Sequence, residues 1–286
     1  MIEHSVHLGP DSRLLGIVSE PDAEAARDSA PTTLLLNAGL VHRVGPNRLN
    51  VNIGRDLASR GFKSARFDMS GIGDSNRPAD EMPYVEQSVA DVVDAMDSFS
   101  AMHGDERFVI IGLCTGAYNA LEAAVADDRV VGAVLIDGYA YPTMRFTVTH
   151  QTKRLLQGWR WARFIKRKLG LLEIAKKKQP DDMLVFEPED LTKAEFDDRI
   201  VGLTRRGVHV HFVYTGFGPQ SYNYEDQLFD AFPHFDRELV TVKFIPGATH
   251  TFTLPTHRDE VVQSIADWFT TSFGSREPAT NGAGGS

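Results

Sequence analysis

The chain has 286 residues, of which 42% are hydrophobic and 24% charged, with a net charge of −9. This length and hydrophobic content suit one large domain, or one domain with an insertion. The sequence predicts no membrane span, because no apolar run approaches the ~20 residues needed to cross a bilayer. It also predicts no secretory signal, because the first residues lack a basic start and an apolar segment.

The single cysteine and the uneven charge limit the location and the partners. A lone cysteine cannot form an internal disulfide, and a reactive free thiol favours a reducing compartment, so we expect a cytoplasmic protein. Residues 151–180 hold ten Lys or Arg and one acid, a net of +9, which leaves −18 on the remainder. This acidic remainder argues against a nucleic-acid partner.

Strand-like and helix-like stretches alternate along the chain. The predicted strands are residues 2–8, 13–18, 32–36, 62–67, 107–113, 130–136, 208–214 and 239–245. The predicted helices are residues 47–60, 84–102, 117–126 and 258–273. A hairpin followed by alternating strands and helices indicates an α/β fold, with a mostly parallel eight-stranded sheet covered by helices on both faces.

Two segments interrupt this order. Residues 142–207 are helical in pattern and rich in basic residues, so we expect a helical cap inserted after the sixth strand. Residues 274–286 are mostly small and polar, and they predict a disordered tail. The predicted organisation is therefore a core of residues 1–141 and 208–273, with a cap at 142–207.

The single cysteine stands between two glycines at the junction of a strand and a helix. Residues 112–116 read G-L-C-T-G, and glycines two positions before and after Cys114 allow an abrupt turn that exposes the central side chain. The amino terminus of the following helix favours a thiolate at Cys114. A buried structural cysteine is the alternative interpretation.

With its neighbouring loops, this turn resembles the nucleophile elbow of the α/β-hydrolase superfamily, over residues 1–141 and 208–273. Residues 68–75, DMSGIGDS, resemble the D-x-R-G-x-G-x-S loop of that superfamily, with Ser70 in place of the more usual arginine. Residues 36–40, LNAGL, occupy the place of its His-Gly oxyanion loop, and residues 246–250, PGATH, resemble its catalytic histidine loop. The resemblance implies an α/β-hydrolase fold with Cys114 as nucleophile and His250 as base.

The acid of the implied triad has two candidates. The loop after the seventh strand, where much of the superfamily has its acid, reads T-G-F-G-P-Q and lacks a carboxylate until Glu225. The end of the sixth strand, residues 134–142, resembles the L-x-D-x-Y-P stretch of polyketide and nonribosomal peptide thioesterases. That resemblance favours Asp137 as the acid, with Glu225 as the alternative.

The remaining site residues follow from the same resemblance. The backbone N–H of Thr115 and that of Gly39 or Leu40 are expected to hold the oxyanion. Arg43 and Tyr139 are candidate substrate-binding residues near the mouth of the site, although a solvated loop arginine is the alternative for Arg43. We expect no metal and no cofactor.

A cysteine nucleophile favours acyl transfer through an acyl-cysteine intermediate, as in a thioesterase, acyltransferase or cyclase acting on an acyl thioester. The thioester could be bound to coenzyme A or to an acidic acyl carrier protein that docks on the basic segment. Solvated cap helices and contact with an anionic membrane surface are alternatives for that segment. The sequence also resembles hydrolases associated with exosortase loci.

Two other functions remain open at this level. A carboxylic-ester or lactone hydrolase would use the same residues, and a catalytically silent α/β-hydrolase scaffold would use none of them. The oligomeric state is not predicted.

Overall fold

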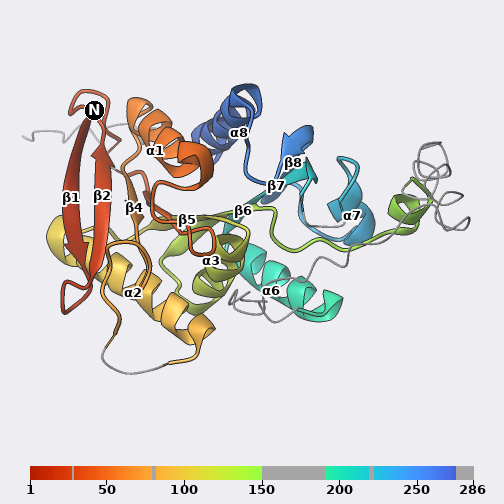
Figure 1. Ribbon diagram of the computed structural model, residues 1–286. Coiled ribbons are helices and arrows are strands. Elements are labelled where there is room, and N and C mark those ends of the chain that lie inside the picture. Colours follow the sequence, from red (N-terminus) through yellow and green to blue (C-terminus); the bar gives the residue numbers. More distant parts are fainter. Residues whose placement is uncertain (28, 79–81, 150–190, 219–221, 275–286) are drawn as a thin grey trace, which may run out of the picture.

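The computed structural model describes residues 1–27, 29–78, 82–149, 191–218 and 222–274. Within these ranges one eight-stranded sheet has the order β1-β2-β4-β3-β5-β6-β7-β8 (Figure 1). The strands are β1 (Ile2–Leu8), β2 (Leu14–Glu20), β3 (Thr32–Leu35), β4 (Ser64–Phe67), β5 (Phe108–Leu113), β6 (Val130–Ile136), β7 (His209–Phe217) and β8 (Val240–Thr249). β2 pairs antiparallel with β1 and with β4, and the other pairs are parallel. The predicted mostly parallel sheet is confirmed.

Helices cover both faces of the sheet, as predicted (Figure 1). The helices are η1 (Pro46–Arg48), α1 (Leu49–Ser59), α2 (Tyr84–His103), α3 (Thr115–Ala126), α6 (Lys193–Arg205), α7 (Gln227–Ala231) and α8 (Pro255–Phe273). α1 and α8 pack together on one face, and α2, α3 and α6 lie on the other.

The sheet separates two hydrophobic clusters because successive side chains of a strand point to opposite faces. Leu34 and Ile110 belong to the cluster that includes α2, α3 and α6. Their neighbours Leu35 and Ile111 belong to the cluster that includes α1 and α8. Strands buried on both faces read as continuous apolar runs, which explains why the central strands could be located from the sequence.

The predicted cap is only partly described. Residues 150–190, with most of the basic segment, lie outside the described residues, as do residues 275–286 of the predicted tail. The described end of the predicted cap is α6, whose Phe196, Ile200 and Leu203 are buried in the cluster shared with α3 and β7. This helix therefore packs on the sheet as part of the core layer.

Several element boundaries differ from the prediction by a few residues, and those of α1, β7 and β8 have clear structural reasons. The helix predicted at 47–60 begins at Leu49, because Asn47 and Arg48 have φ angles of 50° and 64°, outside the right-handed helical region. β7 and β8 extend beyond their predicted ends to Phe217 and Thr249, which pair with each other after an irregularity in register. None of the described helices is both long and apolar enough to span a bilayer.

The parallel strands position the site. β3, β5, β6, β7 and β8 run in the same direction, so their carboxyl ends and the loops that follow meet at one edge of the sheet. Ligands of open α/β sheets bind outside this edge.

Candidate active site

Cys114 occupies a sharp turn between β5 and α3. Its φ and ψ angles are 56° and −121°, a conformation that a residue with a side chain rarely adopts. A Cβ at Gly112 would lie 1.9 Å from the carbonyl oxygen of Gly116, and a Cβ at Gly116 would lie 2.4 Å from that of Asn37. Only glycine fits at these two positions, so the G-x-C-x-G spacing is a steric requirement of this turn.

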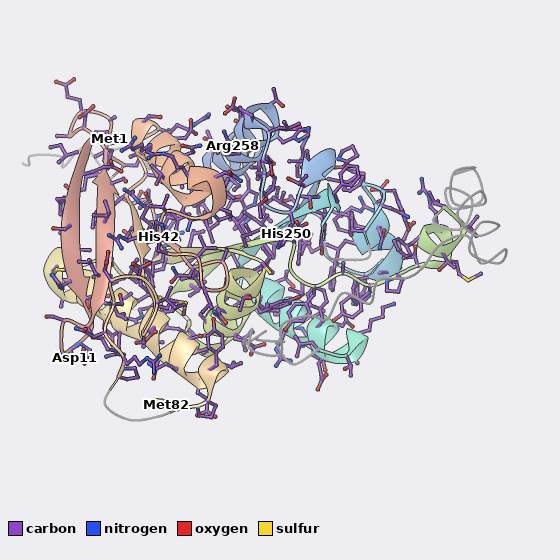
Figure 2. All side chains as sticks on the ribbon, viewed as in Figure 1. Met1, Asp11, His42, Met82, His250 and Arg258 are labelled. Atoms are coloured by element: carbon purple, nitrogen blue, oxygen red, sulfur yellow. The ribbon has the colours of Figure 1, made fainter. Side chains whose placement is uncertain are left out.

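His250 and Asp137 lie in direct contact at the same edge of the sheet. His250 follows β8, and its Nδ1 lies 2.8 Å from Oδ2 of Asp137, which follows β6. The Asp137 side chain is buried, whereas that of His250 is about a quarter exposed at 27%. Figure 2 shows His250 near the middle of the molecule.

Two donors from Thr215, near the end of β7, hold the Asp137 carboxylate. The Thr215 N–H donates to Oδ1 at 2.7 Å, and its hydroxyl donates to Oδ2 at 2.6 Å. A Cβ at Gly218 would lie 2.8 Å from Oδ2 of Asp137, so the turn after β7 approaches this carboxylate closely. Thr215 is therefore a site residue that was not predicted from the sequence, because its contacts with Asp137 depend on the pairing of β6 with β7.

The electrostatics of Cys114 and His250 are coupled. A hydrogen bond with His250 lowers the pKa of Cys114 below its ordinary value, although burial opposes this. Burial alone would lower the pKa of His250, but the hydrogen bonds with Asp137 and Cys114 outweigh it and raise the pKa to about 9. With Nδ1 facing Asp137, Nε2 is the ring nitrogen left to face the sulfur. Both shifts favour the charged pair of a thiolate and an imidazolium.

Glu225, the alternative acid, lies elsewhere. Its Oε1 accepts a hydrogen bond from the Phe244 N–H at 3.3 Å, and its backbone carbonyl accepts one from Tyr222 at 2.7 Å. Of the two candidate acids, the structure therefore brings Asp137 to His250.

The candidate oxyanion donors come from two segments that follow β3 and β5. The backbone N–H of Thr115 hydrogen bonds to Cys114 and contributes to its lowered pKa. Gly39 and Leu40 form a turn closed by the Val41 N–H, which donates to the Ala38 carbonyl at 3.1 Å. Among the described residues, no acceptor pairs with the backbone N–H of Gly39 or Leu40. Both therefore remain candidates for the second donor.

A buried carboxylate, Asp68, organises the loop that carries these donors. It is fully buried and accepts hydrogen bonds from Asn37 Nδ2, Arg43 Nη1 and the N–H groups of Arg43 and Asp74. Asn37 also donates to the Val41 carbonyl at 2.9 Å and accepts from the Met69 N–H at 2.7 Å. Asn37, where the superfamily more often has histidine, thus ties the oxyanion loop to the loop after β4.

Arg43 and Tyr139 make mainly intramolecular contacts. Arg43 pairs with Asp68 and, at 2.8 Å, with Asp74. Tyr139 is 8% exposed and packs edge-on against Tyr118, with ring centroids 4.4 Å apart. Both side chains stabilise structure next to the site, and a substrate-binding role for them stays a prediction. Within the described ranges, no group of three or more His, Cys, Asp or Glu could hold a metal ion.

The sheet, the elbow and the Cys114, His250 and Asp137 cluster define an α/β hydrolase. Residues 40–216 match the family described as serine aminopeptidase, S33. The match covers more than half of the chain, and the chain belongs to this family, with Cys114 at the elbow position. The predicted superfamily and fold class are thereby confirmed.

Solved structures with the same fold have little sequence identity to the chain. Est1E from Butyrivibrio proteoclasticus has a TM-score of 0.60 at 14% identity, covering 95% of this chain and 99% of its own. The α/β hydrolase GrgF from Penicillium sp. sh18 has a TM-score of 0.59 at 15% identity, covering 96% and 100%. The Pyrococcus furiosus esterase Pf2001 reaches 0.57 at 12% identity, covering 96% and 94%. Comparison with curated proteins gave no significant match.

Proposed function

We propose that the protein is an acyl-transfer enzyme that forms an acyl-cysteine intermediate on Cys114 from an acyl thioester. The observation that carries this proposal is a cysteine held in the strained elbow conformation, with His250 as the largest cause of the lowered pKa of its thiol. Asp137, bound to His250 at 2.8 Å, fixes the orientation of the imidazole and favours its charged form.

In the first half-reaction, the Cys114 thiolate attacks the acyl carbonyl and a carbon–sulfur bond forms. The backbone N–H of Thr115 and that of Gly39 or Leu40 stabilise the tetrahedral oxyanion. As the intermediate collapses, the bond from the carbonyl carbon to the leaving group breaks. The leaving thiolate takes the proton of the His250 imidazolium, which leaves acyl-Cys114 beside a neutral imidazole.

In the second half-reaction, neutral His250 removes a proton from an incoming nucleophile, which attacks the acyl-Cys114 carbonyl. Collapse of this intermediate releases the product and restores the thiolate and the imidazolium. Water as nucleophile gives hydrolysis, an external alcohol, amine or thiol gives transfer, and a nucleophile within the acyl group gives cyclisation.

The leaving group favours a thioester over a plain ester. When a thiolate adds to an ester, the intermediate expels the better leaving group, the thiolate, and returns to reactants unless the alkoxide is protonated. When a thiolate adds to a thioester, the two leaving groups are equivalent, so forward collapse needs no such help. A cysteine at this elbow is therefore matched to thioesters.

A carboxylic-ester or lactone hydrolase is the second candidate. It is favoured by the imidazolium of His250, whose pKa of about 9 leaves it charged at neutral pH and able to protonate a leaving alkoxide. Est1E and Pf2001 share the fold, and Pf2001 is named an esterase. This candidate needs the same three residues and differs only in the substrate.

The partner and the location remain predictions. A coenzyme A thioester or an acyl chain on an acidic carrier protein is the proposed donor, with the carrier docked on residues 151–180, which lie outside the described residues. We propose the cytoplasm as the compartment, because a reactive free thiol favours a reducing environment.

The two candidates are separated by comparing matched substrates on the parent protein and on Cys114→Ser. With octanoyl-N-acetylcysteamine and p-nitrophenyl octanoate, we expect the parent to have the higher kcat/KM on the thioester. Cys114→Ser should lose more activity on the thioester than on the ester. A parent that turns over only the ester supports the second candidate, and a parent inactive on both, with Cys114→Ala unchanged, contradicts both.

A further inference from the structure

Large apolar side chains are exposed in two loops and at the end of β7, near the candidate catalytic residues. Leu40 is 79% exposed, Phe217 is 71% exposed and Leu254 is 54% exposed. Single exposed apolar residues are common on protein surfaces, but several that surround one feature indicate a binding surface.

Sequence position and backbone contacts place these residues beside the oxyanion turn and beside the segment that carries His250. Leu40 lies in the turn that carries the candidate oxyanion donors; Ala38 of that turn and Cys114 both pack against the hydrophobic cluster that includes α1 and α8. Phe217 pairs in the sheet with Thr249, the residue before His250. The backbone N–H of Thr253, next to Leu254, donates to the Thr249 hydroxyl at 3.2 Å.

The surroundings of the sulfur also lack charged side chains. Apart from histidines, the segments 38–42, 112–121, 215–218 and 249–257 contain no Asp, Glu, Lys or Arg, although 24% of the whole chain is charged. Beside the oxyanion turn, Arg43 is paired with the buried Asp68 and, at 2.8 Å, with Asp74. Asp137 is buried, with Thr215 and His250 bound to it.

Room for a ligand exists beside the oxyanion turn. An added Cβ at Gly39, which has a φ of +56°, would meet no atom within 4 Å. The backbone N–H of Gly39 is a candidate donor to the oxyanion, so this open space adjoins the place where the acyl carbonyl would lie.

We propose that Leu40, Phe217 and Leu254 form an acyl-chain subsite that takes the uncharged, apolar chain of the substrate's acyl group. That the bound alkyl chain belongs to an acyl group rests on the proposed function. The binding of an alkyl chain beside Cys114 does not depend on that function. Burial of a chain against these side chains removes apolar surface of both partners from water, which stabilises the bound substrate.

The same surroundings disfavour an acyl group with a free α-amine. Recognition of a substrate ammonium requires an accessible, unpaired carboxylate; among the described residues near Cys114, Asp137 is buried and Asp74 is paired with Arg43. The subsite therefore selects fatty acyl over aminoacyl groups. This selection separates the chain from the peptidase activity that its family description names.

Alkylation of Cys114 tests the subsite without requiring catalysis. Iodoacetamide and its N-octyl derivative react by the same step, in which a sulfur–carbon bond forms, the carbon–iodine bond breaks and iodide leaves. The rate of Cys114 alkylation by each reagent is measured by intact mass. It is then divided by the rate at which the same reagent alkylates glutathione, which corrects for intrinsic reactivity. Since a fully buried methylene increases affinity about fourfold, we expect the partly exposed subsite to accelerate the octyl reagent at least ~10-fold over iodoacetamide.

Variants of the exposed side chains test whether the faster alkylation by the octyl reagent depends on the subsite. The double variant Phe217→Ser and Leu254→Ser should lose most of it, and an N-(7-carboxyheptyl) reagent should gain little on the parent. Met102→Ser is the matched control, because Met102 is 48% exposed at the end of α2 and should leave the ratio unchanged. The proposal is overturned if, after division by the glutathione rates, the octyl reagent reacts with Cys114 no faster than iodoacetamide does. It is also overturned if the acceleration persists in the double variant.

Turnover of octanoyl, acetyl and leucyl thioesters of N-acetylcysteamine then distinguishes a failure of the subsite from a failure of the proposed function. Octanoyl above both others supports the subsite and the function together. Octyl acceleration of alkylation without any thioester turnover supports the subsite and contradicts the proposed function. Equal turnover of all three, without octyl acceleration, supports acyl transfer and overturns the subsite.

Discussion

His250 and Asp137 are 113 residues apart in the sequence, yet Nδ1 of the histidine lies 2.8 Å from Oδ2 of the aspartate. Three parallel strands make this contact possible, because β6 ends just before Asp137, β8 ends just before His250, and β7 lies between them. β7 contributes Thr215, which hydrogen bonds to both carboxylate oxygens. The candidate acid and its supporting donors therefore come from adjacent strands.

Replacing Asp137 tests its role as the acid. Asp137→Asn keeps the shape of the side chain but removes the charge that stabilises the imidazolium, so we expect kcat/KM to fall about 10²–10⁴-fold. Glu225→Gln is the matched control, because Glu225 contacts the Phe244 N–H and not His250. Steady-state kinetics on one thioester checks both variants, and a large loss in Glu225→Gln with Asp137→Asn intact contradicts the assignment.

Thr215→Val tests the support of the carboxylate. The substitution removes the hydroxyl that donates to Oδ2 at 2.6 Å while keeping the volume and the backbone donor. We expect the free energy of unfolding to fall by about 1–3 kcal/mol, since the acceptor is charged. Loss of the fixed orientation should lower kcat about tenfold or more.

Thr33→Val is the control for this substitution. Among the described residues, the buried hydroxyl of Thr33 has no hydrogen-bond partner, so its removal should change the unfolding free energy by less than about 1 kcal/mol or increase it. Urea denaturation of both variants gives the comparison. Equal stability and equal kcat for Thr215→Val and Thr33→Val would show that the Thr215 hydroxyl does not hold Asp137.

The coupled pKa shifts predict the pH dependence of Cys114. A lowered pKa means that the thiolate persists at more acidic pH than in an ordinary thiol. A raised pKa means that the His250 imidazolium persists until the pH passes about 9. The kcat/KM profile should therefore be bell-shaped, with its alkaline limb near pH 9.

His250→Ala removes the largest cause of the lowered Cys114 pKa, so the profile of iodoacetamide alkylation should move to higher pH. His234→Ala, a half-exposed histidine paired with Asp197, should leave the profile unchanged. Identical profiles for the parent and His250→Ala would mean that the histidine does not activate the sulfur.

Arg43→Met tests the network beneath the oxyanion loop. Asp68 is fully buried and loses a charged partner in this variant, so we expect the free energy of unfolding to fall by about 3–5 kcal/mol. Asp74, the other partner of Arg43, has a side chain that is 63% exposed. Asp74→Asn should therefore lower the free energy of unfolding by less than about 1 kcal/mol. Similar losses in the two variants would contradict a buried network centred on Asp68.

Much of this arrangement could be predicted from local sequence. The elbow requires Gly112 because a Cβ there would meet Gly116 within the same turn, and the central strands are continuous apolar runs. The order of the elements then placed His250 and Asp137 at one edge of the sheet, because parallel strands end together.

The contacts that depend on distant residues were not predictable in this way. Arg43 resembles a solvated loop arginine in the sequence, and only folding brings it to Asp68, 25 residues away. The carboxylate contacts of Thr215 depend on how β6 and β7 pair, which no local pattern specifies. The start of α1 was missed because the left-handed conformations of Asn47 and Arg48 have no clear sequence signal.

The most direct test of the central claim is an intact-mass measurement of the protein mixed with an acyl thioester and quenched in acid within the first turnovers. The account predicts a mass increase of one acyl group, located on Cys114 by peptide mapping, absent in Cys114→Ala and longer-lived in His250→Ala once formed. Turnover of the thioester without an adduct on Cys114, or with full activity in Cys114→Ala, would contradict it.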